Sequence, residues 1–298
     1  MNANPKSHYK AGFLTALTTP FTASGEIDGK AVSALVQNAK NLGLDGLYVG
    51  GSTGEGFLLS PEIRAELFES VAEAADGSLK LIAQVGAIEV AQAERNAVSA
   101  AKAGFHEVSS TPPIYFKHTL AEMKDYYRDL QSACDLPMVL YNIPALTGVS
   151  LPNQFFFDLS EDMNISGIKY TSTDIIQLVG LLDGLKDVPV YYGVDEMLVA
   201  GLSVGSHGGI GSTYNILGRE YRELAEYLAS GNLSAADELQ ARANRFIDVL
   251  VSVGMPTALK ACLEIRGLCS ARPMRPFHAV SKDDMKRLEV ALEKLDQK

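Results

Sequence analysis

Lys169 has the surroundings that an amine nucleophile needs. It stands inside the short, mostly apolar run of residues 165–170, whereas most other lysines of the chain lie in polar segments. Apolar surroundings disfavour the ammonium form and lower the pKa of a lysine. At the reference pKa of about 10.4, only about one amine in a thousand is neutral near pH 7.4. The run therefore favours Lys169 as a Schiff-base nucleophile; the alternative is a lysine that reaches solvent or pairs with a carboxylate.

Tyr141 ends another short apolar run, residues 138–141. Its phenol could exchange a proton with a substrate hydroxyl if the tyrosine lies one strand away from Lys169. The alternative is a core aromatic side chain whose hydroxyl is bonded to a backbone carbonyl. The two residues support one another, because both are predicted near the ends of strands.

Two glycine-rich segments could hold an anion. Residues 50–55 contain Ser52 and Thr53 between glycines, which permit a positive φ and let successive N–H groups converge on an anion. The segment matches neither a Walker A loop nor GxGxxG, so a tight turn is the alternative. Residues 208–213, with Ser212, follow the last predicted strand, where barrels often bind anionic groups.

Asp195 and Glu196 follow the predicted strand at residues 190–192. They could bind substrate or equally form the acidic first turn of a helix, which stabilises the helix without a functional role. The five histidines show neither HxxxH nor HExxH spacing. The sequence therefore indicates no metal site and disfavours a metal-dependent aldolase.

The elements that must position these residues alternate regularly. Short apolar or β-branched runs are separated by longer segments with apolar residues at helical spacing, which predicts a parallel sheet joined by right-handed crossovers. Eight such units within about 205 residues favour a closed (β/α)8 TIM barrel, an α/β fold with its active site at the carboxyl ends of the strands. The predicted strands are residues 13–17, 46–49, 80–85, 107–110, 138–141, 165–170, 190–192 and 209–212.

The alternation stops after residue 218. Helical patterns follow at residues 220–229, 234–253, 257–266 and 281–295, with no low-complexity linker before them. The sequence thus predicts a barrel over residues 1–218 and a C-terminal helical extension over residues 219–298, packed on the barrel or on a partner subunit.

Composition limits the class of partner. With 298 residues, 47% of them hydrophobic and 21% charged, the chain has the composition of a globular protein. Its net charge of −10 argues against nucleic acid and anionic membrane, but it leaves room for a small anion held locally. Three cysteines without a CxxC pair, a polar segment at residues 1–8 and no membrane-length apolar stretch favour a cytoplasmic protein.

Four motifs, in the same order along the chain, resemble those of the N-acetylneuraminate lyase and dihydrodipicolinate synthase superfamily of class I aldolases. They are residues 50–55, 141–148, 167–169 and 208–215. The resemblance implies that Lys169 forms the Schiff base and that Tyr141 is the acid/base. It also implies that Ser52 and Thr53 hold the substrate carboxylate, with Ser52 helping to relay the proton. Tyr115 matches a tyrosine that reaches the neighbouring subunit's site in a homotetramer.

One position separates the branches of this superfamily. Leu146 stands where the synthase branch carries an arginine, and leucine cannot supply the bidentate, charged donor that a guanidinium gives. The first glycine-rich loop and the Gly-x-Asp-Glu segment also resemble the lyase branch, although Val194 replaces a common aromatic residue. That branch implies contacts to the hydroxylated tail and N-acyl end of a sugar acid from Thr171, Gly193, Asp195, Glu196 and Ser212.

The resemblance leads to an expected activity. It is the reversible cleavage of the sialic acid N-acetylneuraminate to pyruvate and N-acetylmannosamine, with no metal or organic cofactor. Two alternatives remain open. One is another pyruvate-dependent aldolase or a keto-sugar-acid dehydratase of the same superfamily, and the other is a barrel that binds a sugar acid without turnover.

Overall fold

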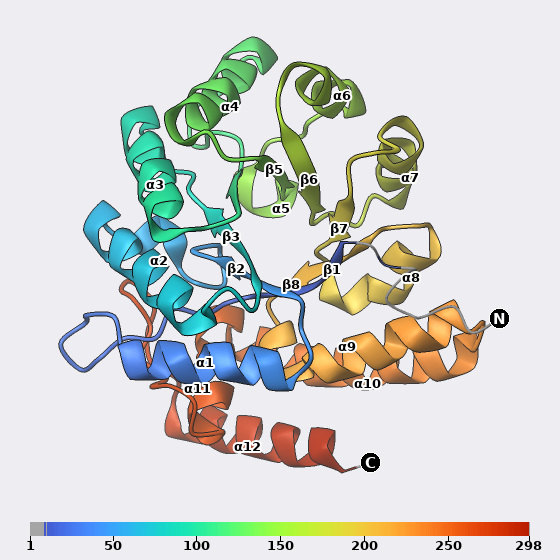
Figure 1. Cartoon of the computed structure of the whole chain (residues 1–298). Helices are drawn as coiled ribbons and strands as arrows, with labels where there is room; N and C mark the ends of the chain where they lie inside the picture. Colours follow the sequence, from blue (N-terminus) through green and yellow to red (C-terminus); the bar gives the residue numbers. More distant parts are fainter. Residues whose placement is uncertain (1–8, 10, 298) are drawn as a thin grey trace.

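A closed barrel of eight parallel strands forms the centre of the molecule, as the sequence predicts (Figure 1). The computed structural model describes residue 9 and residues 11–297, so the polar segment at residues 1–8 lies outside the described residues. The strands pair in chain order, and β8 closes the barrel against β1. They are β1 Gly12–Ala16, β2 Gly46–Val49, β3 Lys80–Gln84, β4 Glu107–Ser110, β5 Met138–Asn142, β6 Ile165–Tyr170, β7 Val190–Tyr192 and β8 Gly208–Gly211.

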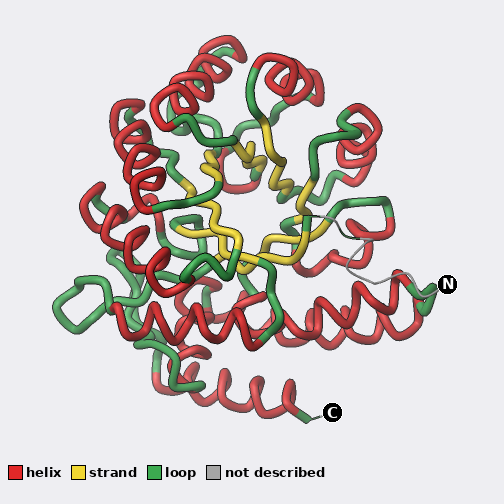
Figure 2. The backbone as a smooth tube through the Cα atoms, in the orientation of Figure 1, coloured by secondary structure: helices red, strands yellow, loops and turns green. Residues whose placement is uncertain are grey.

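Helices surround the strands as an outer ring, which Figure 2 shows in red around the yellow barrel. The helices of the barrel are α1 Gly29–Asn41, α2 Pro61–Ala75, α3 Val90–Ala103, α4 Leu120–Cys134, α5 Pro144–Thr147, α6 Asn153–Asp162, α7 Ile175–Gly184 and α8 Leu198–Ser203. Two short 3-10 helices, η2 Gly56–Leu58 and η3 Asp195–Met197, follow β2 and β7. Both therefore lie at the carboxyl ends of strands, where a barrel places its active site.

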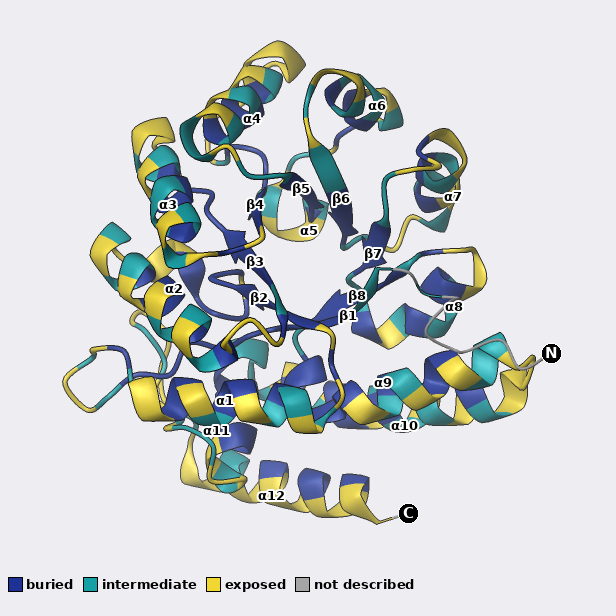
Figure 3. Cartoon of the chain, in the orientation of Figure 1, coloured by how far each residue is buried: buried dark blue, intermediate teal, exposed yellow. Residues whose placement is uncertain are grey.

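Side chains of each strand alternate between two apolar cores, because successive residues of a strand point to opposite faces. The larger core lies between the barrel and the helices, and Figure 3 shows the buried inner faces of those helices in dark blue. The smaller core fills the barrel itself. Its buried members are Leu14, Ala16, Tyr48, Ile82, Val139, Tyr141, Ile143, Tyr191 and Ile210.

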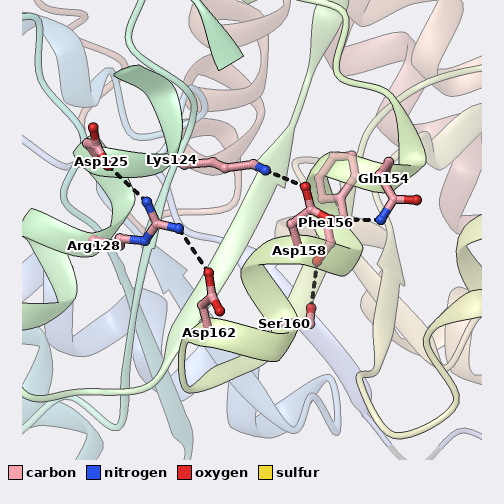
Figure 4. Close-up of polar contacts among 8 residues, drawn as sticks. All are labelled: Lys124, Asp125, Arg128, Gln154, Phe156, Asp158, Ser160 and Asp162. Carbon is pink, nitrogen blue, oxygen red and sulfur yellow. Dashed lines mark hydrogen bonds and ion pairs between the residues drawn. The ribbon is translucent and has the colours of Figure 1, made fainter. Parts of the chain in front are cut away.

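Polar contacts fasten helices α4 and α6, which flank β5 in the chain. Lys124 and Arg128 on α4 form ion pairs with Asp158 and Asp162 on α6, the second with an N–O distance of 2.9 Å (Figure 4). Asp158 also accepts a hydrogen bond of 2.7 Å from Gln154. α4 begins with a capping box in which the Thr119 and Glu122 side chains bond each other's backbone N–H groups.

The C-terminal part of the chain is helical, with α9 Tyr214–Ala229, α10 Leu233–Val253, α11 Met255–Ile265 and α12 Lys282–Asp296. α9 packs on β1, and α10 packs on α9, α11 and α12. α9 continues across residue 218, and the division of the chain there stays a prediction.

In the part of the chain that the structure describes, no single helix has the length and apolar composition of a membrane span. α10 and α11 reach that composition together, but they meet at a bend of 113°.

Candidate active site

Lys169 points into the barrel near the end of β6. Its neighbours Ile168 and Tyr170 belong to the outer core, so the alternation of the strand turns Lys169 inward. Gly167, two residues earlier on the same face, leaves room for a ring: a Cβ atom there would lie 3.1 Å from the ring of Tyr191. Lys169 is only 3% exposed, and this burial lowers its pKa to about 7, although the charge of Asp195 acts in the opposite direction.

Two aromatic rings enclose the amine of Lys169. Its Nζ atom lies 4.0 Å from the ring centre of Tyr48 and 4.1 Å from that of Tyr141. Cation–π attraction favours the ammonium form, whereas desolvation, the largest cause of the lowered pKa, favours the neutral amine. Tyr48 is held in turn by hydrogen bonds from its hydroxyl to Ser109 Oγ (3.0 Å) and from Ser109 Oγ to the Val139 carbonyl (2.7 Å).

The phenol of Tyr141 lies among hydroxyl groups. Tyr141 is the register partner of Lys169 across β5 and β6, and burial raises its pKa to about 12. The hydroxyls of Thr171 and Ser52 favour the phenolate and partly offset that rise, whereas Asp195 adds to it. Thr171 Oγ1 is one of the groups that affect the pKa of the phenol. It is buried and has no hydrogen-bond partner among the described residues. Tyr141 is therefore protonated at neutral pH and has polar neighbours for proton exchange.

Asp195 lies at the start of η3 and is buried beside β8. Its Oδ2 atom accepts hydrogen bonds from the backbone N–H of Thr213 (2.9 Å) and from Thr213 Oγ1 (2.6 Å). A Cβ atom on Gly211 would lie 1.7 Å from Asp195 Oδ1, so only glycine allows this approach. Burial raises the pKa of Asp195 to about 6, while Thr213 lowers it. Oδ1 has no hydrogen-bond partner among the described residues.

The two glycine-rich segments meet at the same end of the barrel. Thr53 Oγ1 and Ser212 Oγ lie 2.6 Å apart and share a hydrogen bond, which joins the loop after β2 to the loop after β8. The backbone N–H groups of Ser52 and Thr53 donate no hydrogen bond to any described residue. They are donors without an acceptor, which is the property expected of an anion site.

Gly193 follows β7 and lies against Thr171, where a Cβ atom would approach Thr171 Oγ1 to 2.1 Å. Glu196 is exposed, and its carboxylate pairs with no described residue, although its charge raises the pKa of Asp195 and Tyr192. These residues therefore belong to the same region as Lys169.

Tyr115 is the predicted site residue that the structure places elsewhere. Its side chain is 84% exposed and contacts the ring of Phe116, with ring centres 4.9 Å apart. Its φ of 82° is uncommon for a residue other than glycine. Within one subunit it is not among the residues around Lys169. Leu146, on α5, is also exposed.

Three features of the site were not predicted from the sequence. Tyr48 and Thr213 contact the predicted site residues Lys169 and Asp195, and Lys260 pairs with Glu55 of the first glycine-rich loop. Among the described residues, no group of three or more histidine, cysteine, aspartate or glutamate side chains could hold a metal ion.

Comparisons of sequence identify the family. The model of the dihydrodipicolinate synthetase family matches residues 9–295. An N-acetylneuraminate lyase from Rhizobium meliloti (strain 1021) is 42% identical over 282 residues, which cover 94% of this chain and 94% of that protein. An N-acetylneuraminate lyase from Enterobacter sp. (strain 638) is 38% identical over 286 residues, covering 95% of this chain and 96% of that protein.

Comparisons of structure agree. CdNal from Clostridium difficile, solved in complex with mannosamine, matches with a TM-score of 0.92 at 30% identity, covering 95% of this chain and 98% of that one. N-acetylneuraminate lyase from Fusobacterium nucleatum, solved with pyruvate, matches with a TM-score of 0.91 at 31% identity, covering 98% and 99%. The buried lysine, its tyrosine partner, the closed barrel and these relatives lead to one conclusion: the chain belongs to the dihydrodipicolinate synthetase family.

Proposed function

We propose that this protein is a Schiff-base aldolase that reversibly cleaves N-acetylneuraminate to pyruvate and N-acetyl-D-mannosamine. The observation that carries the proposal is the buried amine of Lys169, whose pKa is lowered to about 7. About half of such amines are neutral at pH 7, against about one in 3,000 at a pKa of 10.5. The relatives that are named N-acetylneuraminate lyases support the choice of substrate.

The bond changes follow from this amine. The neutral Nζ of Lys169 attacks the C2 ketone of the open-chain sugar acid and gives a carbinolamine. Protonation of the carbinolamine hydroxyl and its departure as water leave a positively charged iminium. A base removes the proton of the C4 hydroxyl, and C4 becomes the carbonyl carbon of N-acetylmannosamine. The electron pair of the C3–C4 bond moves into the iminium and gives an enamine. Protonation at C3 and hydrolysis of the C=N bond then release pyruvate and regenerate the amine.

Tyr141 is placed to move the proton. With a pKa of about 12 its phenol carries a proton at neutral pH, so in the condensation direction it can donate to the developing C4 alkoxide. In the cleavage direction it receives the C4 proton as its own proton passes through a neighbouring hydroxyl to solvent, from which the proton added later at C3 can come. The hydroxyl of Ser52, which lies close enough to influence the phenol, is the neighbour that we assign to this relay.

The remaining predicted residues divide between the two ends of the substrate. The unpaired backbone N–H groups of Ser52 and Thr53 can donate hydrogen bonds to the carboxylate, with the Ser52 hydroxyl beside them. Glu196 and the free Oδ1 of Asp195 can accept hydrogen bonds from a polyhydroxyl tail. We assign Thr171, Gly193 and Ser212 to contacts with the substrate between these ends, because Gly193 lies against Thr171 and Ser212 is bonded to Thr53.

The assembly and location that we propose are those expected from the sequence, a cytoplasmic homotetramer. The exposed ring of Tyr115 and its positive φ fit a residue shaped for contact with a neighbouring subunit's site. This assigns to Tyr115 a role that a single subunit cannot supply.

The test is to trap the imine. Borohydride in the presence of pyruvate should inactivate the enzyme, and peptide mapping by mass spectrometry should find the reduced adduct on Lys169. Lys169→Ala should show neither the adduct nor pyruvate release from N-acetylneuraminate. Lys260 is an internal control, because it is as buried as Lys169 but pairs with Glu55 at 2.5 Å. Burial lowers the pKa of Lys260 as well, but the charge of Glu55 opposes that shift and occupies the amine. Labelling at Lys260, or cleavage by Lys169→Ala, would contradict the proposal.

A further inference from the structure

Glu55, the last residue of the first glycine-rich loop, is joined to the C-terminal helices by a buried ion pair. Its Oε1 atom lies 2.5 Å from Nζ of Lys260 on α11, and neither side chain has any exposed surface. Glu55 also has a φ of 58°, in the left-handed region. The residue that follows the predicted carboxylate site by two positions is thus fixed by a part of the chain about 200 residues away.

Both charges have further partners. Lys260 Nζ donates a hydrogen bond of 3.0 Å to the carbonyl of Arg272 and lies 4.3 Å from the ring centre of Phe21. The backbone N–H of Met274 donates to Glu55 Oε2. The segment after α11 therefore completes the enclosure of this pair.

Two other elements hold the neighbouring residues of the loop. Thr19 Oγ1 donates a hydrogen bond of 2.7 Å to the carbonyl of Gly54. The buried guanidinium of Arg64 on α2 donates to the carbonyl of Gly56. Gly54, Glu55 and Gly56 are therefore each anchored by a different element, while the N–H groups of Ser52 and Thr53 stay unpaired.

The cost of the pair indicates that it does more than stabilise the fold. Burying two opposite charges is expensive, and well-packed apolar residues in their place are often equally or more stabilising. What a buried ion pair provides is a single geometry, because either charge is strongly disfavoured without its partner. Here the ion pair fixes the position of Glu55. Through Glu55 it also fixes the direction of the N–H groups of Ser52 and Thr53.

We propose that Lys260 and Glu55 are positioning residues for carboxylate binding: the C-terminal helices, through this ion pair, hold the loop at residues 52–55 in its anion-binding form. The inference rests on the proposed function, because it takes Ser52 and Thr53 as the carboxylate site. It gives α11 a part in substrate affinity through a contact with the loop and not with Lys169.

The experiment measures pyruvate binding and turnover in Lys260→Met, in Glu55→Gln and in the double variant. Half-saturating pyruvate comes from borohydride inactivation, and kcat and KM come from cleavage of N-acetylneuraminate. Charged hydrogen bonds lost from a carboxylate should raise half-saturating pyruvate and KM about tenfold or more. The turnover number should fall much less, because Lys169 and Tyr141 are untouched.

The double variant and a conservative one make the test decisive. Glu55→Gln with Lys260→Met leaves no unpaired charge, and if the pair acts as a unit its effect should match that of one single variant rather than their product. Glu55→Asp keeps both charges, so the variant should fold. Its side chain is one methylene shorter, so the loop should shift and the half-saturating concentration of pyruvate should rise. Arg266→Met is the matched control, since it removes an exposed ion pair to Asp296 at the end of α11; it should change neither constant.

Normal half-saturating pyruvate in the folded double variant or in Glu55→Asp would overturn the inference, whatever happens to the melting temperature. The trapping result with the wild-type enzyme separates this outcome from a failure of the proposed function. A wild-type enzyme that forms the Lys169 adduct while these variants bind pyruvate normally contradicts the inference alone. A wild-type enzyme that forms no adduct contradicts both.

Discussion

Tyr141 and Lys169 are register partners on β5 and β6, and Lys169 Nζ lies 4.1 Å from the centre of the Tyr141 ring. Burial acts on the two groups in opposite directions, lowering the pKa of the amine to about 7 and raising that of the phenol to about 12. Near pH 7 about half of the amine is therefore neutral, and almost all of the phenol is. A neutral amine can attack a ketone, and a neutral phenol can donate a proton. Burial in the same place thus brings both groups toward the protonation states that the reaction needs.

Tyr141→Phe should leave the barrel folded and lower the cleavage rate by about 10²- to 10⁴-fold, the usual effect of removing a positioned acid/base. The ring beside Lys169 is retained, so imine formation with pyruvate should persist. Steady-state cleavage of N-acetylneuraminate and borohydride trapping measure the two steps separately.

Tyr170→Phe is the control for that variant. It removes a phenol from the adjacent position on the outer face of β6, where the hydroxyl bonds the Asp174 carbonyl at 2.7 Å. Normal cleavage by Tyr141→Phe, or an equal loss in both variants, would remove Tyr141 from the proton transfer.

Asp195→Asn should shift the acid limb of imine formation to lower pH. The charge of Asp195 raises the pKa of Lys169, so removing it lets burial lower that pKa further. The asparagine oxygen can still accept from Thr213, so the local fold should survive. The measurement is the rate of borohydride trapping with pyruvate as a function of pH.

The window for this effect follows from both groups. With pKa values of about 6 for Asp195 and about 7 for Lys169, both are largely charged between those values. The variant should therefore differ most from the wild type there and little above pH 8. An acid limb that stays in place, or moves to higher pH, would show that Asp195 does not act on the amine by its charge.

Pattern alone was sufficient to predict the barrel, because each strand is a short buried run and each connection is amphipathic. The ends of elements were harder to predict. α9 was expected from residue 220 but begins at Tyr214, since Asn215, a residue typical of loops, bonds the carbonyls of Ala16 and Ser212 and is buried. β8 similarly begins and ends one residue before its expected range. Contacts between distant elements decide such boundaries.

Apart from the family resemblance and the glycine-rich segments, the signal for a site residue was a polar residue that interrupts an apolar run. Lys169 gives that signal, and so does Lys260 within the apolar residues of α11, where it was overlooked. Tyr48 gives no such signal, because an inward-facing aromatic residue beside a lysine and an ordinary core tyrosine look the same in sequence. Thr213 contacts Asp195 only because β7 and β8 are adjacent.

Lys169→Met should raise stability near neutral pH. A lysine whose folded pKa is lowered destabilises the folded state below its unfolded pKa, and that cost disappears as the pH rises from about 7 to about 10.5. The shift corresponds to about 4 kcal/mol at pH 7, as an upper estimate. Chemical denaturation of both proteins at several pH values measures the difference.

Only the difference between the two proteins is informative, because other groups titrate in both. The stability gain should be fully developed below about pH 7 and should vanish toward pH 10.5. A gain that does not depend on pH would mean that methionine merely packs better, and a loss at pH 7 would contradict the desolvation of Lys169.

Glu196→Gln should change the choice among sugar acids more than it changes the chemistry. The carboxylate is exposed, pairs with no described residue and lies beside Asp195, so it is free to accept hydrogen bonds from a polyhydroxyl tail. The neutral amide retains the shape but weakens those bonds, since charged hydrogen bonds are roughly twice as strong as neutral ones. The measurement is the ratio of kcat/KM values for N-acetylneuraminate and for a substrate that lacks a tail hydroxyl.

The outcome separates this role from that of a carboxylate that only stabilises the first turn of η3. Such a carboxylate contributes about 0.3 to 1 kcal/mol to the fold and nothing to selectivity. Glu238→Gln, an exposed carboxylate on α10, is the control and should leave the kcat/KM ratio unchanged. If Glu196→Gln also leaves the ratio unchanged while pyruvate trapping stays normal, Glu196 belongs to the helix start and not to the substrate site. The opposite outcome is a ratio that falls toward one while kcat with pyruvate and N-acetylmannosamine is little affected. In that case Glu196 binds the substrate tail and determines selectivity, but takes no part in bond cleavage.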